Sequence, residues 1–219
     1  LSQGKTTLTF IRDHYDAVFV ACGNGHSLGL RVAGETLAID GLAFLSECRK
    51  AMDSSTEPHD IYRGKTAAVV GGGNSAIDVA RTLLRLGAQP PLVYRRRRED
   101  MPAFAQEIAH ALEEGVRLVE LRAPLSLSRV GDCLQLLTQK MHITEPGTDG
   151  RMRVGPITGA VESFVVDAVY AAIGAEAEKP WKSLADSGEW LSLSHSRTYT
   201  GEKYGIPLLQ EHPILSLAR

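Results

Sequence analysis

The stretch VVGGGNSAIDVAR, residues 69–81, decides the fold that this sequence predicts. The stretch begins at the end of a run of small and apolar residues, contains three glycines and continues with the pattern of an amphipathic helix. Gly71, Gly73 and Ala76 fit the pattern G-x-G-x-x-G/A, directly after a predicted strand and directly before a predicted helix. In that context the pattern indicates the phosphate-binding turn of a dinucleotide-binding domain.

The three small residues of this pattern have different physical tasks. Gly71 permits the tight turn after the strand, and Gly73 has no Cβ, so a pyrophosphate can approach its backbone. Ala76 allows the helix to pack closely on the strand. The first N–H groups of the helix lack intrahelical acceptors and carry the positive end of its dipole, so they attract phosphate. The alternative is a turn that only joins strand to helix, and the strand that follows the helix favours nucleotide binding.

The surrounding sequence predicts alternating strands and helices. The expected helices cover residues 43–52, 75–86 and 103–114, and the expected buried strands cover residues 16–21, 67–70, 92–94, 116–121 and 167–173. Apolar stripes mark the two later helices, with Ile77, Ala80 and Leu84 on one and Phe104, Ile108, Ala111 and Leu112 on the other. This alternation indicates an α/β fold of Rossmann type with a parallel sheet.

Two further segments depart from this alternation. Residues 134–144 and 160–166 read as strands joined by the turn EPGTDG, and together they predict a β-meander inserted between the βαβ units. Asp78 and Arg81, three residues apart on the helix after the glycines, are expected to pair with each other or to contact an adjoining domain.

The end of the second strand indicates which dinucleotide binds. An NAD-binding unit usually carries Asp or Glu there, but this strand ends in four arginines, and no carboxylate appears before Glu99. Arg95 and Arg96 are expected to bind a 2′-phosphate, whereas Arg97 and Arg98 are expected to be exposed. The alternatives are a solvated basic loop or a patch for an acidic partner. The spacing of about 20 residues from the glycines favours the 2′-phosphate.

The composition excludes several other classes of protein. The 219 residues are 43% hydrophobic and 23% charged, and the net charge of −2 gives no reason to expect nucleic-acid binding. No run of apolar residues is long enough to predict a membrane span. Three widely spaced cysteines without a CxxC motif favour reduced thiols and a cytoplasmic location, and neither they nor the scattered histidines indicate a metal site.

Four runs of this sequence resemble the glutamate synthase small subunit and its relatives, which include the flavin–NADPH arm of dihydropyrimidine dehydrogenase. The runs are VVGGGNSAIDVAR, VYRRRREDMPA, EEGV and DAVYAAIG, and the most specific element is Y-R-R-x-x-x-x-M-P at residues 94–102. The resemblance covers roughly residues 11–175. It implies an NADPH domain inserted into an FAD domain, with electrons passing from NADPH to FAD and then to iron–sulfur clusters or a partner subunit.

The resemblance also implies positions for the cofactors. The residues that would face the pyrophosphate are Gly71, Gly72, Gly73, Asn74, Ser75 and Ala76. Arg95 and Arg96 would face the 2′-phosphate, Ala172, Ile173 and Gly174 would lie near the nicotinamide, and Gly23 would help to cover the flavin. Residues 1–60 would then be a partial flavin-domain segment and linker, residues 61–175 the NADPH-binding domain, and residues 176–219 a tail that returns to the flavin domain.

The chain departs from the resembled family in what would hold the flavin. No second glycine fingerprint precedes residue 71, no N-terminal cysteine cluster occurs, and the family's later GD motif is not found in the tail. We therefore expect part of a longer protein that binds NADPH, binds FAD weakly or not at all, and works with an adjoining flavin domain and an iron–sulfur domain or large subunit. The rival hypothesis is a non-catalytic nucleotide-binding module with a regulatory or assembly role. A thioredoxin-reductase-like enzyme is disfavoured because CxxC is missing.

Overall fold

The computed structural model describes residues 14–15, 25–53, 62–147 and 152–176. Residues His26–Glu176 form one compact unit. The strand expected at residues 16–21 and the predicted flavin contact at Gly23 lie outside the described residues, as does the tail from residue 177. The assignment of separate flavin and NADPH segments along the chain stays a prediction.

A five-stranded parallel sheet forms the centre of this unit. Its strands stand in the order β2-β9-β3-β4-β5, and every neighbouring pair is parallel. The bounds are β2 (Ile39–Asp40), β3 (Ala67–Gly71), β4 (Pro91–Val93), β5 (Arg117–Val119) and β9 (Ala168–Ala172). All five residues of β3 are buried, which explains its unbroken run of small and apolar residues, because both faces of the strand are covered. The predicted α/β fold of Rossmann type is confirmed.

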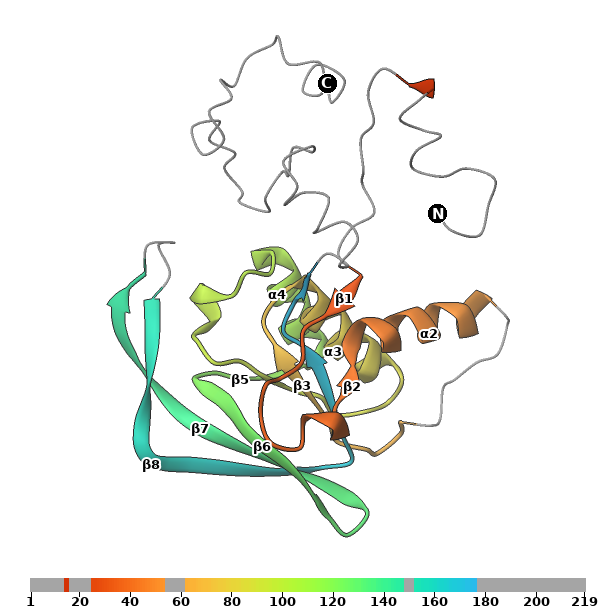
Figure 1. The fold of residues 1–219 in the computed structure, drawn as a ribbon. Coiled ribbons are helices and arrows are strands. Elements are labelled where there is room, and N and C mark those ends of the chain that lie inside the picture. Colours follow the sequence, from red (N-terminus) through yellow and green to blue (C-terminus); the bar gives the residue numbers. More distant parts are fainter. Residues whose placement is uncertain (1–13, 16–24, 54–61, 148–151, 177–219) are drawn as a thin grey trace. The chain divides into compact units, whose positions relative to one another are not determined.

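Three helices cover one face of this sheet (Figure 1). They are α2 (Gly41–Asp53), α3 (Asn74–Arg85) and α4 (Ala105–Glu114), each starting and ending within two residues of its predicted bounds. Ala67 and Val69 of β3 join their apolar residues in one core, while Ala68 and Val70 face the opposite way into a second core. This alternation is the period of two that a strand imposes on its side chains.

The second core is closed by a separate antiparallel sheet. Its strands are β6 (Arg122–Val130), β7 (Cys133–Pro146) and β8 (Met152–Val166), in the order β6-β7-β8. The predicted meander is confirmed, but β6 was not expected and β8 begins eight residues before its predicted start. Leu134 and Leu136 of β7 are buried against the parallel sheet, which fixes the inward face of the meander.

Short elements complete the described structure. β1 (His26–Ser27) pairs with β10 (Ala175–Glu176) in an antiparallel ladder, and two 3₁₀ helices, η1 (Glu35–Leu37) and η2 (Arg98–Asp100), lie in the loops. The Asp40 carboxylate accepts hydrogen bonds from the N–H groups of Leu42 and Ala43 at 2.8 and 3.2 Å. This carboxylate therefore caps the N-terminus of α2.

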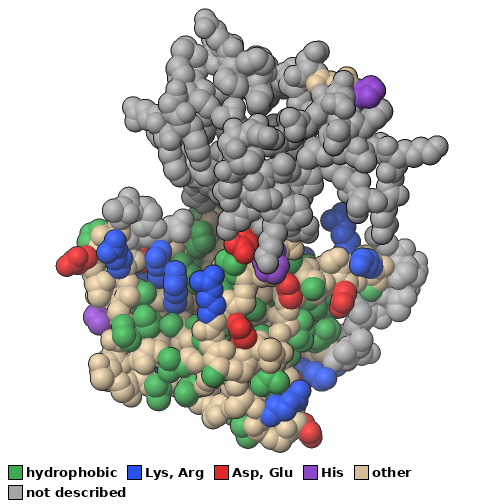
Figure 2. Space-filling view, in the orientation of Figure 1, with side chains coloured by type: hydrophobic (Ala, Val, Ile, Leu, Met, Phe, Trp, Pro, Cys, Tyr) green, Lys and Arg blue, Asp and Glu red, His purple; other side chains and the backbone are tan. Residues whose placement is uncertain are grey.

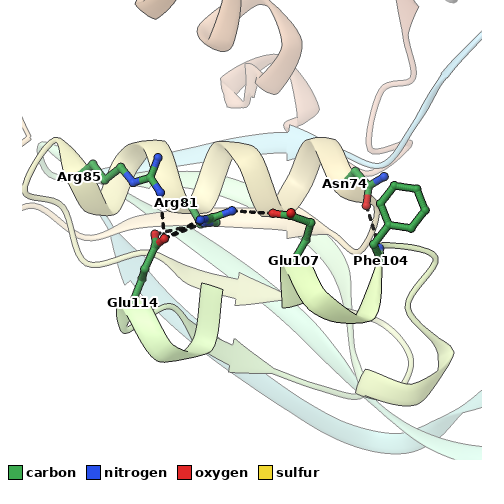
Figure 3. A network of polar contacts seen from close by, with 6 residues as sticks. All are labelled: Asn74, Arg81, Arg85, Phe104, Glu107 and Glu114. Carbon is green, nitrogen blue, oxygen red and sulfur yellow. Dashed lines mark hydrogen bonds and ion pairs between the residues drawn. The ribbon is translucent and has the colours of Figure 1, made fainter. Parts of the chain in front are cut away.

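Charged side chains join α3 to α4 (Figure 3). Arg81 makes ion pairs with Glu107 and Glu114, each at 2.6 Å, and Arg85 pairs with Glu114 at 2.8 Å. The expected pair between Asp78 and Arg81 is therefore replaced by pairs to the neighbouring helix. The pKa of Asp78 is raised, first by burial and then by the nearby Glu107 carboxylate. Arg81 thus connects two helices rather than two turns of its own helix.

The prediction for one residue of the apolar stripe on α4 is wrong. Phe104 is 61% exposed, whereas Ile108 and Ala111 are buried as expected. Phe104 is the N-cap residue, with φ −63° and ψ 134°, so its side chain does not follow the helical spacing of the residues after it.

The α3–α4 network predicts a pH-dependent contribution to stability. The hydrogen bond from Arg81, opposed by desolvation and aided by Arg85, lowers the pKa of Glu114 from its ordinary 4.5 to about 2. Ionised Glu114 therefore stabilises the folded state, fully above pH 4.5 and progressively less as the pH falls towards 2. Glu114→Gln should lower the thermal unfolding midpoint at pH 7, and the difference from the unchanged chain should shrink to nothing near pH 2.

Glu113→Gln is the matched control, because Glu113 is the exposed neighbour on α4 and the change in net charge is the same. Equal midpoint losses for both variants at pH 7, or a Glu114→Gln loss that does not depend on pH, would contradict the role of the network.

Candidate functional site

The glycine turn lies at the carboxyl edge of the parallel sheet, where the strand order reverses. From β3 the chain crosses through α3 to β4 on one side, while β9 pairs with β3 on the other side. Gly71 stands directly opposite Ala172 in the ladder. The predicted pyrophosphate residues and the predicted nicotinamide residues, Ala172–Gly174, therefore meet at one edge. Ligands of open α/β sheets bind at such a reversal.

Gly71 is required by the packing around it. A Cβ on Gly71 would lie inside the van der Waals envelope of the Ala172 carbonyl and 2.9 Å from the Ala76 Cβ. Its φ of +155° adds a conformation that residues with side chains rarely adopt. Ala76 itself is fully buried. Both residues thus allow β3 and α3 to pack closely, as the motif predicts. The third element in this contact is β9, which lies about 100 residues later in the chain.

Gly72 is covered by the ring of Tyr94. A Cβ on Gly72 would lie 2.9 Å from the Tyr94 Cζ and closer still to two other ring carbons. The Gly72 carbonyl accepts a hydrogen bond from the Ala103 N–H at 3.2 Å. The Tyr94 ring therefore occupies the side of Gly72 where a Cβ would lie. The predicted contact of Gly72 with the pyrophosphate concerns its remaining backbone atoms and stays a prediction.

Gly73 borders open space. No heavy atom outside its chain neighbours lies within 4 Å of a Cβ built on it. It is the N-cap residue of α3, with φ −88° and ψ 176°, and its carbonyl accepts the N–H groups of Ala76 and Ile77 at 3.0 and 3.2 Å. The N–H groups of Asn74 and Ser75 belong to the first turn, where a helix offers no acceptor of its own. The arrangement provides space, donors and the positive end of a helix dipole.

The Asn74 side chain is held by the neighbouring loop. Its Oδ1 accepts a hydrogen bond from the Phe104 N–H at 2.9 Å (Figure 3). This oxygen therefore supports the start of α4, and the predicted role of Asn74 at the pyrophosphate rests on its backbone N–H. Ser75 and Ala76 continue the same turn of α3.

The predicted arginine pair follows β4 beside the glycine turn. Val70 of β3 stands opposite Val93 of β4, so the chain passes through Tyr94 and reaches Arg95 just beyond this edge of the sheet. Arg95 is exposed and Arg96 is half-buried. Figure 2 shows a row of Lys and Arg side chains on one face of the described residues, although the whole chain carries a net charge of −2. Positive charge is thus concentrated locally.

The next two arginines behave differently from each other. Arg97 was expected to be exposed, but it is half-buried and its Nε donates to the Asp100 carboxylate at 2.9 Å. Arg98 is exposed as expected, and its backbone N–H donates to the Glu120 carboxylate. Asp100 is 5% exposed, and the hydrogen bond from Arg97, opposed by desolvation, lowers its pKa. The sequence pattern gives no signal for Asp100, because the folded loop brings it to Arg97 and Met152.

The assembled edge carries the free N–H groups of a helix start and two arginines, which suit phosphate groups, and Ile173 beside it is 41% exposed. Within the described ranges, no three His, Cys, Asp or Glu side chains are placed to hold a metal ion. No helix among the described residues is both long and apolar enough to cross a membrane. The chemistry that these residues support is the binding and orientation of a dinucleotide.

The fold is of Rossmann type with an additional antiparallel meander, and its glycine turn has the sequence pattern and position of a dinucleotide-binding turn. Residues 4–188 match the family model of the pyridine nucleotide-disulphide oxidoreductases, and the chain belongs to that family. The resemblance to the glutamate synthase small subunit is confirmed by curated relatives. The chain is 37% identical to the NADP(+)-dependent formate dehydrogenase subunit beta of Moorella thermoacetica, over 78% of this chain and 24% of the relative.

Two other relatives have similar coverage. The glutamate synthase (NADPH) small chain of Halomonas elongata is 31% identical over 77% of this chain and 37% of its own length. The NADPH-Fe(3+) oxidoreductase subunit beta of Geobacter sulfurreducens is 36% identical over 77% of this chain and 25% of its own length. The chain therefore spans about a quarter to two fifths of the length of the curated relatives it matches.

Solved structures support the fold. FprA from Mycobacterium tuberculosis, in complex with NADPH, matches 77% of this chain and 52% of its own, with a TM-score of 0.61 and 16% identity. Thioredoxin reductase from Lactococcus lactis matches 76% of this chain and 46% of its own, with a TM-score of 0.52 and 17% identity.

The glycine geometry predicts losses of stability of different size for the same substitution at two positions. Gly71→Ala places a methyl group against Ala172 and Ala76, so the free energy of unfolding should fall by about 1–3 kcal/mol. Gly73→Ala places the same group in open space at a φ that alanine adopts, so the loss should stay below about 1 kcal/mol, the ordinary cost of alanine at an N-cap. Urea unfolding of both variants measures the difference. A Gly73→Ala loss equal to or larger than that of Gly71→Ala would contradict the packing assigned to Gly71.

Proposed function

We propose that this chain is the NADPH-binding part of a flavin-dependent oxidoreductase of the glutamate synthase small-subunit type. The observation that carries the proposal is the register that brings the open N-terminus of α3, the arginine segment after β4 and the end of β9 to one edge of the sheet. The names of the relatives, which include NADPH-dependent oxidoreductase subunits, support the choice of cofactor.

Each part of the edge has a proposed role toward NADPH. Gly73 leaves room for the pyrophosphate, and the N–H groups of Asn74 and Ser75 donate to it. Arg95 and Arg96 bind the 2′-phosphate by charge-assisted hydrogen bonds, which an arginine fork suits better than a lysine. Ala172, Ile173 and Gly174 form the wall beside the nicotinamide. NADPH, when bound, supplies a hydride, and the proposed acceptor is FAD.

The chain's own contribution to that transfer is geometric. Hydride transfer between two cofactors needs close approach and a fixed orientation of the two rings, and no side chain has to supply a proton at the reacting atoms. We propose that the flavin is held mainly by protein outside the 219 residues, since no second glycine fingerprint occurs before residue 71. An iron–sulfur domain or partner subunit would accept the electrons, in a cytoplasmic protein.

A titration with both nicotinamide cofactors tests the proposal. The unchanged chain should bind NADPH more tightly than NADH. Arg95→Ala and Arg96→Ala should each weaken NADPH binding by about tenfold to a hundredfold, the worth of one charged hydrogen bond, while NADH binding stays nearly unchanged. Gly73→Val should weaken both cofactors, because the branched side chain fills the space for the pyrophosphate that both share. Calorimetry measures the dissociation constants of both cofactors for each chain.

Arg98→Ala is the matched control, because Arg98 is an exposed arginine of the same loop. It should leave the preference for NADPH in place. Equal weakening of both cofactors by Arg95→Ala and Arg96→Ala would show that these arginines do not read the 2′-phosphate. A Gly73→Val variant that binds as tightly as the unchanged chain would remove the N-terminus of α3 from the site.

The placement of the flavin makes a separate prediction. The purified chain should be colourless, and with NADPH it should not reduce dyes or quinones, because no acceptor lies within reach of the nicotinamide. Free FAD should restore little activity. Addition of the flavin-domain segment of a relative should restore both the yellow colour and NADPH-dependent dye reduction. An absorbance spectrum and a dye-reduction assay measure these outcomes, and a stoichiometric flavin with turnover in the chain alone would overturn this placement.

A further inference from the structure

We infer that Asp100 is a positioning residue that sets how the Arg95–Arg96 segment stands relative to the glycine turn, and so determines the preference for the 2′-phosphate. This inference rests on the proposed function, because it deepens the role of the same site. It assigns Asp100 no contact with the cofactor. Its basis is a series of hydrogen bonds from Asp100 to the arginine segment, to the meander and to Tyr94, whose ring packs on the glycine turn.

The Asp100 carboxylate joins two segments that are far apart in the sequence. Its Oδ2 accepts from the Arg97 Nε at 2.9 Å, and its Oδ1 accepts from the Met152 backbone N–H at 3.1 Å. The side chain of Asp100 is almost fully buried, so this ion pair is shielded from solvent on the carboxylate side. The carboxylate therefore anchors the loop after β4 to the first residue of β8.

The Asp100 backbone holds the other end of the same loop. Its N–H donates to the Arg97 carbonyl at 3.0 Å, and its carbonyl accepts the Tyr94 hydroxyl at 2.9 Å. Tyr94 is buried, and its ring is the group that packs on Gly72. Arg95 and Arg96 lie between Tyr94 and Arg97, so both ends of the arginine pair are tied to Asp100.

The residues that follow Asp100 connect the loop to α3. The Ala103 N–H donates to the Gly72 carbonyl at 3.2 Å, and the Phe104 N–H donates to the Asn74 Oδ1 at 2.9 Å. The glycine turn is thus held from its Tyr94 side and from its Ala103 side by one continuous segment. Displacement of Asp100 would move the proposed 2′-phosphate residues relative to the proposed pyrophosphate site.

Geometry of this kind affects discrimination more than overall affinity. The two phosphate sites must stand at a fixed separation to bind one molecule, and a shift of the arginines costs only the cofactor that carries the 2′-phosphate. A purely structural Asp100 would instead stabilise the fold and leave the ratio of the two affinities unchanged. The ratio of the NADH and NADPH dissociation constants therefore separates the two roles.

Asp100→Asn in the full chain is the test, because it keeps the size of the side chain and removes its charge. We expect the ratio of the NADH to the NADPH dissociation constant to fall about tenfold, with NADH binding nearly unchanged. Tyr94→Phe is the second variant, since it removes the hydrogen bond to the Asp100 carbonyl and keeps the ring on Gly72. Its ratio should fall by about threefold to fivefold, the worth of one neutral hydrogen bond.

A double-variant comparison asks whether Asp100 acts through the arginines. In a chain that already carries Arg95→Ala and Arg96→Ala, Asp100→Asn should cause no further fall in the ratio. Glu114→Gln is the control, because it removes an ion-paired carboxylate from the α3–α4 network and should lower stability without changing the ratio. Calorimetric titration of each chain gives the constants.

The outcomes separate this inference from the proposed function. An unchanged chain that does not prefer NADPH overturns the proposed function, and the inference falls with it. An unchanged chain that prefers NADPH, together with Asp100→Asn and Tyr94→Phe variants that keep the ratio, overturns the inference alone. A fall of the same size with and without Arg95 and Arg96 also overturns it, because Asp100 would then act by another route.

Discussion

The close approach of β9 to the glycine turn is the constraint on which the rest of the structure depends. Gly71 stands opposite Ala172, and a single methyl group on Gly71 would collide with the carbonyl of that residue and with Ala76. The absence of a side chain at one position thus lets strand, sheet neighbour and helix meet. The same contact places the end of β9 beside the N-terminus of α3, which is the geometry that a dinucleotide requires.

The segment from Tyr94 to Phe104 connects the glycine turn to the arginines that we propose bind the 2′-phosphate. Its first residue packs on Gly72, its middle carries the arginines, and its last residues hydrogen-bond to Gly72 and Asn74. This explains why the most specific element of the family resemblance extends eight residues past the tyrosine. At the Met–Pro end of that element, Met101 is buried in the core and its N–H donates to the Arg98 carbonyl at 3.1 Å.

Local patterns predicted much of this fold, and contacts that form only in the folded chain account for most of the errors. The strand–glycine–helix unit was predicted because its signals lie within 20 residues, and the helix ends predicted at residues 86 and 114 lie within one residue of the observed ends for the same reason. β6 was not predicted although Leu125 and Leu127 alternate with serines. Its inward and outward faces are defined only by the pairing with β7, which the sequence pattern does not reveal. The predicted exposure of Arg97 was wrong because only the folded loop brings its side chain to Asp100.

The position of β9 also governs the order in which the sheet can form. β9 separates β2 from β3, yet it follows β3 only after two α-helices, the strands β4 and β5 and the three strands of the meander. Thr66 and Asp167, 101 residues apart, exchange hydrogen bonds at 2.8 Å that fix the register at the start of both strands. During synthesis, one edge of β3 must therefore stay unpaired until the residues of the meander and then of β9 have been added to the chain. Such long-range parallel pairing forms slowly. Until it forms, the unpaired edge of an apolar strand favours aggregation.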